Sequence, residues 1–465
     1  MSGAGLGTWW RTVKQLHPLQ LGGRVPHQLV QALVARTGVS AASALSPRRL
    51  GLPADVSAVL KAFADAEARR YEARLAWVAK NPNLAAYEAR YALDLGAGDV
   101  EATRWTDRVS LAPYVASVRA RRLASAIARG RVELFPHVVR AARAVLVAPE
   151  VHLLGNHLLE NGIGLVAAAS VADGAEADLW WRAGAAILDW QVPLQFYSDG
   201  MHDEGSMTYH LWLVAGLIEA IALADTAGRS VPAHWVELVE RAIGIARDYE
   251  APDGRYPLFN DAAYDAGPSI ARVVELARTC GFHVREPRSE RAFTSEVGWV
   301  VLRNERAWCV MKAGPDGSAT QPGHVHADLL SIELWVDGQK RISDPGVTSY
   351  NDDAERAWCR SSAAHNGPHF EGEDTSEVWA AFRTGRRARA TLEAVDEGGG
   401  FATCNATRTS GLETVRRTLN LTGDALTVDD LVEGSQRGEL GSAPERWQVA
   451  AADASHRRFV FAFSP

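Results

Sequence analysis

Cysteine is scarce in this sequence, and the few cysteines lie far apart. They are Cys280, Cys309, Cys359 and Cys404 in a chain of 465 residues, and no two of them form a CxxC pair. A disulfide framework needs more cysteines, and a zinc knuckle or redox dithiol needs them in close pairs. We therefore expect four free thiols, buried or half-buried.

Positive charge is also in short supply. The chain has 49 Lys+Arg against 56 Asp+Glu, so its formal net charge is −7. Proteins that bind nucleic acids through phosphate contacts usually carry a basic stripe, so we expect no nucleic-acid partner. An anionic ligand is still compatible with this balance, because a local basic cleft can lie on an acidic protein.

The sequence lacks both a long apolar run and a signal-peptide pattern. No stretch of about 18 uncharged apolar residues occurs, so we expect no transmembrane helix and no membrane partner. Residues 1–7 carry no positive charge, and residues 8–20 mix tryptophan with arginine and lysine. The expected location is cytoplasmic by default, and periplasmic or secreted if a leader was removed. The oligomeric state is left open.

Helical periodicity dominates residues 1–285. A chain of this length predicts two or three domains, because a single core rarely grows so large. Apolar residues recur at spacings of three and four, which is typical of helices with buried faces. These runs are 57–71, 113–128, 157–172, 179–194, 210–227 and 233–249. Loops rich in Gly, Pro and Asp separate the later runs, so we predict an all-helical domain of antiparallel helices.

Strand patterns replace the helical ones from about residue 293. Short β-branched or aromatic runs occur at 297–302, 307–312, 331–336, 339–343, 388–395, 412–419, 426–430 and 458–463. Asp337-Gly338 between two of them is a strong hairpin signal. We predict an antiparallel β domain over 293–465, with the boundary in the charged, Pro-containing stretch 281–295. Its last run stops two residues before the C-terminus, which leaves open a sheet that is truncated there.

The segment QPGHVHAD at 321–328 is the most informative for chemistry. His324 and His326 are two residues apart, so on a strand they would share one face. Asp344 follows 18 residues after His326, and His365 comes 21 residues later. Histidine and aspartate are zinc ligands, but spacing this wide is a weak signal by itself. The alternative is that Asp344 caps a turn and that the histidines are half-buried.

Three further polar segments are candidates, and each has a structural alternative. HLLGNHLLEN places Asn156, His157 and Glu160 near a helix start, where Asn is often a cap. DGMHDEGSMTYH places Tyr209 at the start of an apolar helix, where packing is a common role. DGRYPLFND ends in Asp261, for which a turn is the favoured interpretation.

These residues allow a ranking of chemistries. A serine hydrolase lacks a GxSxG elbow, and a phosphate enzyme lacks a P-loop. A glycoside hydrolase needs a carboxylate pair, which Asp203, Glu204 and Asp261 could supply. A set of Asn, Tyr and His suits β-elimination, which needs a carboxylate neutraliser, a base and an acid.

Taken together and in order, these motifs resemble the heparinase II/III-like polysaccharide lyases. The matching segments are GNHLLENG, DGMHDEGSMTYH, PDGRYPLFNDA, PGHVHADLLSIEL, DPGVTSY, RSSAAHN and EVWAAFR, which span about 150–390. The resemblance implies an incomplete (α/α) toroid followed by an antiparallel β-sandwich, an α+β multidomain fold. It also implies cleavage of uronic-acid-containing glycans by β-elimination, which leaves a 4,5-unsaturated uronide.

The resemblance also implies roles for individual residues. Asn156 is similar to the family's carboxylate neutraliser, with His157 as a helper or alternative base. Tyr209 resembles the acid, and His324 resembles the opposing base.

Substrate contacts and a metal site are implied in the same way. Glu160, Glu204 and Arg360 are expected to contact the substrate, an anionic polysaccharide or oligosaccharide. A structural zinc ion is expected on His326, Asp344 and His365. The alternatives are a glycoside hydrolase on this scaffold and a non-catalytic protein of exopolysaccharide binding or assembly. Alginate, a glycosaminoglycan or a bacterial exopolysaccharide all remain open as substrates, as do endo and exo action.

Overall fold

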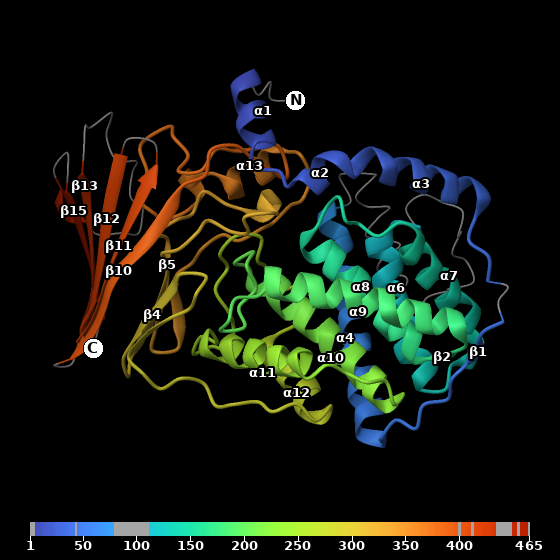
Figure 1. The fold of residues 1–465 in the computed structure, drawn as a ribbon. Helices are drawn as coiled ribbons and strands as arrows, with labels where there is room; N and C mark the ends of the chain where they lie inside the picture. Colours follow the sequence, from blue (N-terminus) through green and yellow to red (C-terminus); the bar gives the residue numbers. More distant parts are fainter. Residues whose placement is uncertain are drawn as a thin grey trace.

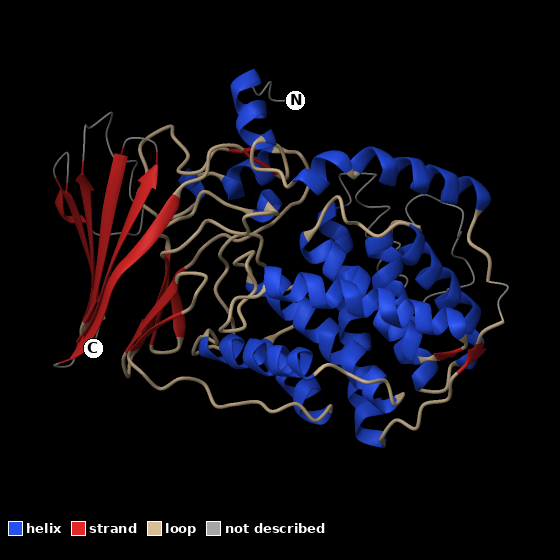
Figure 2. Cartoon of the chain, in the orientation of Figure 1, coloured by secondary structure: helices blue, strands red, loops and turns tan. Residues whose placement is uncertain are grey.

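The computed structural model describes residues 5–41, 44–78, 111–398, 401–410, 413–433, 449–452 and 456–463. Helices make up one side of the molecule and β-sheets the other (Figures 1 and 2). This arrangement confirms the predicted α+β multidomain fold, with helices first and antiparallel sheets second.

The helical part follows the periodicity of the sequence. Its described helices are α1 Leu6–Val13, α2 Pro18–Gly22, α3 Arg24–Thr37, α4 Ala54–Val78, α6 Pro113–Ala128, α7 Phe135–Val147, α8 Gly155–Ser170, α9 Ala175–Gln195, α10 Met207–Thr226, α11 Ala233–Asp248 and α12 Ile270–Thr279. Two short strands, β1 Ser46–Pro47 and β2 Ala172–Asp173, pair beside them. Helix α10 is apolar and long enough to cross a membrane, but 89% of that window is buried inside the protein. It is therefore packed as the core helix of this domain.

Two large antiparallel sheets follow from Ala292, together with a two-stranded one formed by β8 (Val378–Trp379) and β9 (Arg383–Thr384). One has the order β3-β4-β5-β6-β7, formed by Ala292–Thr294, Trp299–Arg303, Ala307–Lys312, Ile332–Val336 and Gln339–Ile342. The other has the order β10-β11-β12-β13-β15-β14, formed by Arg389–Gly398, Phe401–Ser410, Glu413–Leu421, Ala425–Glu433, His456–Ala462 and Val449–Ala452. The predicted hairpin is confirmed, since β6 pairs with β7 and both Asp337 and Gly338 have positive φ.

The central strands β4, β5 and β6 of the first sheet are buried on both faces. On one face, Val300 and Leu302 belong to a core shared with Leu419 and Val428 of the second sheet. On the other face, side chains such as Trp299 belong to the core of the helical domain. Successive residues of a strand point to opposite faces, which explains why β4 reads as a continuous apolar run. This sheet therefore ties the β-sandwich to the helices.

The N-terminal helix α1 packs on the β domain, far from it in sequence. Its Arg11 and Thr8 side chains bond Glu377, with Arg11 Nε 2.7 Å from Glu377 Oε2. Trp9 lies edge-on to Trp379 of β8 (Val378–Trp379), with ring centroids 4.8 Å apart. The first residues thus bridge the two domains across the top of Figure 1.

Candidate functional site

Two aromatic rings from different domains stack at the centre of the candidate site. Tyr209 lies in the first turn of α10, and His324 ends the short 3-10 helix Pro322–His324 of the β domain. Their ring centroids are 4.3 Å apart and the rings are nearly parallel, at 13°. The Tyr209 hydroxyl also lies 3.1 Å from the hydroxyl of Tyr350. The structure therefore brings together the two residues to which the resemblance assigns acid and base roles.

Glu204 orients His324. Its Oε2 lies 2.6 Å from His324 Nδ1, and the carboxylate is almost fully buried. Burial alone would raise the pKa of Glu204, but attraction and hydrogen bonding to His324 hold it below its usual value. An ionised carboxylate only accepts hydrogen bonds, so His324 Nδ1 donates to Glu204 and Nε2 is the ring nitrogen left for a substrate. Glu204 therefore supports the histidine, and its expected role as a substrate contact finds no support in this placement.

The first residues of α8 lie close to the loop that carries His324 and to Glu204. Leu154 and Gly155 both have positive φ, at 59° and 55°. A Cβ at Gly155 would lie 3.0 Å from the side chain of Gln321 and 3.5 Å from Glu204 Oε1. Glycine therefore allows α8 to begin against the loop that carries His324. Gln321 fixes the approach by donating from Nε2 to the Leu153 carbonyl at 3.3 Å.

Asn156 and His157 follow directly. Asn156 is 3% exposed, and its Oδ1 has no hydrogen-bond partner among the described residues. His157 stacks on Tyr114, with ring centroids 4.4 Å apart, and its Nδ1 lies 3.3 Å from Glu150 Oε1. Desolvation favours the neutral ring, but the charge of Glu150 outweighs it and raises the pKa of His157. His157 therefore stays cationic to a higher pH than a free histidine.

Glu160 and Arg360 lie elsewhere. Glu160 is fully buried, and its Oε1 lies 3.0 Å from Arg121 Nε. Arg360 is 1% exposed and donates to the carbonyls of Val325 and Ala380. Both side chains bond protein groups away from solvent, so the expectation that they contact substrate finds no support in their placement.

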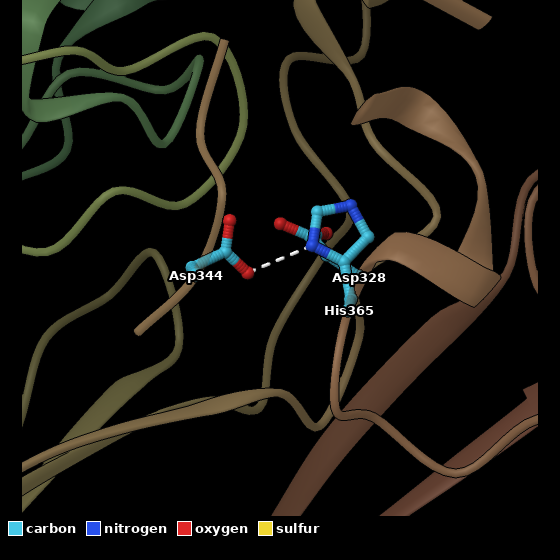
Figure 3. Close-up of side chains that lie close together, drawn as sticks. All are labelled: Asp328, Asp344 and His365. Carbon is cyan, nitrogen blue, oxygen red and sulfur yellow. Dashed lines mark hydrogen bonds and ion pairs between the residues drawn. The ribbon is translucent and has the colours of Figure 1, made fainter. Parts of the chain in front are cut away.

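A buried cluster behind His324 can hold a metal ion. Asp328, Asp344 and His365 offer ligand atoms that all lie within 4.8 Å of one another (Figure 3). His365 Nδ1 lies 2.8 Å from Asp344 Oδ2. Asp328 was not predicted as a ligand, although its position two residues after His326 repeats the spacing of the two histidines. Lys312 also bonds its carboxylate.

His326 borders the same cluster. Its ring centroid lies 5.5 Å from that of His365. The buried atoms His326 Nδ1 and His365 Nε2 have no hydrogen-bond partner among the described residues. Two orphaned imidazole nitrogens beside carboxylates are a donor set that suits zinc. The other nitrogen of His326 lies 2.8 Å from Asp261 Oδ1, as expected for a carboxylate that orients a metal-binding histidine.

The carboxylates of the alternative hydrolase are differently placed. Asp261 is fully buried and bonds both His326 and Arg356. Desolvation opposes its charge, but attraction to Arg356 keeps the pKa of Asp261 far below the usual value. Burial and the nearby Glu204 raise the pKa of Asp203 to about 8. Asp261 and Glu204 already serve neighbouring histidines, so no exposed pair of carboxylates emerges from the three.

The sequence matches models of a known protein family. Residues 141–279 match the heparinase II/III N-terminus, and residues 286–461 match the heparinase II/III-like C-terminal domain. The chain belongs to the heparinase II/III-like family. Both halves of the candidate site lie within the matched residues.

Curated relatives of this family member are heparin-sulfate lyases. Those of Bacteroides stercoris and Pedobacter heparinus are 25% and 26% identical to it, over 236 and 238 residues. Each alignment covers 46% of this chain and 35% of the relative, so the match spans about a third of the length of these relatives.

Solved structures of the family share the fold. A crystal structure of heparinase III has a TM-score of 0.60 at 17% identity and covers 82% of this chain and 73% of that one. A heparan sulfate lyase mutant from Pedobacter heparinus has a TM-score of 0.57 at 18% identity, covering 84% and 72%. This likeness confirms the helical toroid followed by a β-sandwich.

Proposed function

We propose that this protein is a lyase that cleaves uronic-acid-containing glycans by β-elimination. The observation that carries the proposal is the Tyr209–His324 stack, with Glu204 behind the histidine and Asn156 at the start of the facing helix. The reaction breaks the C5–H bond of the uronic acid and the C4–O bond to the leaving sugar. A C4=C5 double bond forms, and the leaving oxygen takes up a proton.

The first requirement is neutralisation of the uronate carboxylate, because a full negative charge would make the C5 proton too weakly acidic. Asn156 and His157 are the proposed groups. Asn156 brings a buried amide whose Nδ2 can donate to the carboxylate, and His157 brings a cation whose charge Glu150 stabilises. Such groups favour the charge that develops on the carboxylate after the proton leaves.

The second requirement is a base and an acid on the C5 and C4 atoms. His324 is the proposed base, because Glu204 holds its Nδ1 and directs Nε2 as the acceptor. Tyr209 is the proposed acid, which gives its phenolic proton to the leaving oxygen. Where the C5 proton lies on its side of the sugar, Tyr209 is also the proposed base.

The proposed cofactor is a structural zinc ion held by His326, Asp344 and His365, with Asp328 beside them. Its role would be to hold the loops behind His324 together. Elemental analysis of protein purified without added metal tests this, with about one zinc per chain as the expected result. His326→Ala should lose the zinc, and full retention would refute this ligand. Asp328→Asn separates the two possible sets, since it should keep the zinc if Lys312 already neutralises that carboxylate.

The proposed substrate is a polyanionic glycan, and the names of the relatives place heparan-type glycosaminoglycans first among those to test. A panel of heparan sulfate, other glycosaminoglycans, alginate and bacterial exopolysaccharides should be incubated with the full chain. Ultraviolet absorbance of the unsaturated uronide and the number of reducing ends are measured together. A lyase raises both in step on at least one polymer. Reducing ends without absorbance would instead identify a hydrolase.

A further inference from the structure

The segment between β8 and β9 (Arg383–Thr384) presents an exposed aromatic ring beside the candidate site. Phe382 is 46% exposed. Its ring centroid lies 6.2 Å from that of His324 and 5.9 Å from that of Tyr350, and it is nearly parallel to Tyr350. Tyr350 in turn contacts Tyr209 through its hydroxyl. Phe382 therefore lies at the edge of the proposed acid–base pair and has much of its surface open to solvent.

Two buried arginines hold this segment in place. Arg356 Nε donates to the Ala381 carbonyl at 2.9 Å, and Arg360 Nη1 donates to the Ala380 carbonyl at 2.8 Å. Arg360 also bonds the hydroxyl of Thr384 at 3.2 Å. Charged donors to carbonyls are among the stronger hydrogen bonds, so the backbone on both sides of Phe382 is fixed.

The same arginine backs the aromatic rings. The guanidinium carbon of Arg356 lies 5.2 Å from the ring centroid of Phe382 and 5.3 Å from that of Tyr350. Arg356 is fully buried and paired with Asp261, so it cannot move with the substrate. The ring of Phe382 thus rests on a rigid support, which lowers the entropy lost when a ligand binds to it.

The backbone of the segment is also strained. Ala380 has φ of 48°, a left-handed conformation that is uncommon for a residue with a side chain. Such conformations persist where the surroundings enforce them, and they cluster at functional sites. Here the surroundings are Arg356, Arg360 and the loop at Gly323, which lies in ordinary van der Waals range of the Phe382 backbone and Cβ.

We propose that Phe382 is a substrate-binding residue whose ring packs against the C–H face of a pyranose unit next to the scissile bond. The proposal rests on the proposed lyase function. A pyranose ring presents C–H groups on its flatter face, and an aromatic ring offers an apolar surface with negative charge over its centre. Binding sites for small ligands combine such apolar surfaces with a few well-placed polar groups. Arg360, expected to touch the substrate, would act instead as a positioning residue for this platform.

Kinetics of Phe382 variants on the best polymer of the panel test the proposal. Phe382→Ala should raise KM by up to about tenfold, the loss expected for one aromatic contact, while kcat stays within about twofold. Phe382→Tyr and Phe382→Trp should restore the wild-type KM. Trp358→Ala is the matched control, since Trp358 is 51% exposed on α13 (Ala354–Arg360) and should leave both constants unchanged.

A binding arm keeps this proposal separate from the lyase assignment. The affinity of the polymer is measured calorimetrically for Tyr209→Phe and for Tyr209→Phe combined with Phe382→Ala. Weaker binding of the double variant, by up to about tenfold, supports the platform even if no unsaturated product ever forms. An unchanged KM together with an unchanged affinity would overturn it, as would a loss confined to kcat.

Discussion

Helix α8 carries two buried polar side chains one turn apart, Asn156 and Glu160, and their surroundings differ. Around Glu160 lies an interior charge cluster of Arg121, Arg122, Glu160 and Glu219, in which each charge has an opposite charge beside it and all four are at most 5% exposed. Asn156 carries no charge, its buried oxygen has no partner among the described residues, and Gly155 beside it lies against Gln321 of the β domain.

These surroundings distinguish residues that stabilise the fold from residues of the candidate site. Buried charges that pair within three helices, α6, α8 and α10, complete one another and specify how those helices pack. The one unbonded oxygen of Glu160, Oε2, belongs to a carboxylate already paired with Arg121, whereas the unbonded oxygen of Asn156 belongs to a neutral amide next to the loop that carries His324. Residues one turn apart therefore belong to different tasks, and substitutions should separate them.

The largest effect on activity is expected for Asn156→Ala. The variant should lose about 10²–10³-fold in kcat/KM, the usual loss for one group that stabilises developing charge. Its unfolding midpoint should stay close to wild type, because the amide oxygen has no partner to lose within the described part of the chain. Asn156→Asp is the isosteric companion and should be at least as inactive, since it adds a like charge next to the uronate. A large fall in stability with intact activity would show that Asn156 stabilises the fold and does not take part in the reaction.

The next effect is on stability and comes from Glu160→Ala. Removing this carboxylate leaves Arg121 buried with Glu219 as its remaining partner, so the free energy of unfolding should fall by about 3 kcal/mol. Urea unfolding followed by circular dichroism measures it. The protein that remains folded should keep wild-type KM. A raised KM without destabilisation would show that Glu160 contacts substrate after all.

A smaller effect is expected for Glu204→Gln. The amide can still bond His324 Nδ1 but no longer stabilises a protonated ring, so kcat should fall by about tenfold. Steady-state kinetics on the cleaved polymer measure kcat and KM separately. KM should change little. An unchanged kcat would contradict the role assigned to Glu204.

The smallest effect concerns the pH range set by His157. Glu150 raises the pKa of His157, so activity that needs the imidazolium should persist at higher pH than a free histidine allows. Glu150→Gln removes that charge, lowers the pKa of His157 and should move the alkaline limb of kcat/KM to lower pH. Activity on the acid side of the optimum should be retained, because the ring is protonated there in both proteins. An alkaline limb that does not move would remove His157 from the carboxylate-binding role.

Local patterns in the sequence were sufficient for most of the elements. The predicted runs 113–128 and 307–312 coincide with α6 and β5, because periodic burial is written into neighbouring residues. Strand β11 was missed, since FATCNATRTS is largely polar and pairs with two neighbours that sequence periodicity does not reveal. The docking of α1 on β8 joins residues about 370 positions apart and has no local signal.

The candidate site shows the same limit. Motif order pointed to Tyr209 and His324, and the structure stacks them. Contacts between distant residues determine the roles of the others. Glu160 forms a buried ion pair with Arg121, and Arg360 donates to the 380–384 segment. Asp328 lay within a quoted motif, but only the fold places it beside Asp344 and His365. Residue type and spacing therefore predict candidate site residues, and the tertiary contacts of each candidate show whether it lies in the site or supports it.

The most direct test of the central claim is the Tyr209→Phe variant on the polymer that the wild type cleaves best. Removing one hydroxyl leaves the aromatic stack on His324 and loses only the hydrogen bond to Tyr350, so the unfolding midpoint should fall only slightly. We expect unsaturated-uronide absorbance to grow steadily with the wild-type protein and not above background with the variant. Undiminished growth of that absorbance in a folded Tyr209→Phe protein would contradict it.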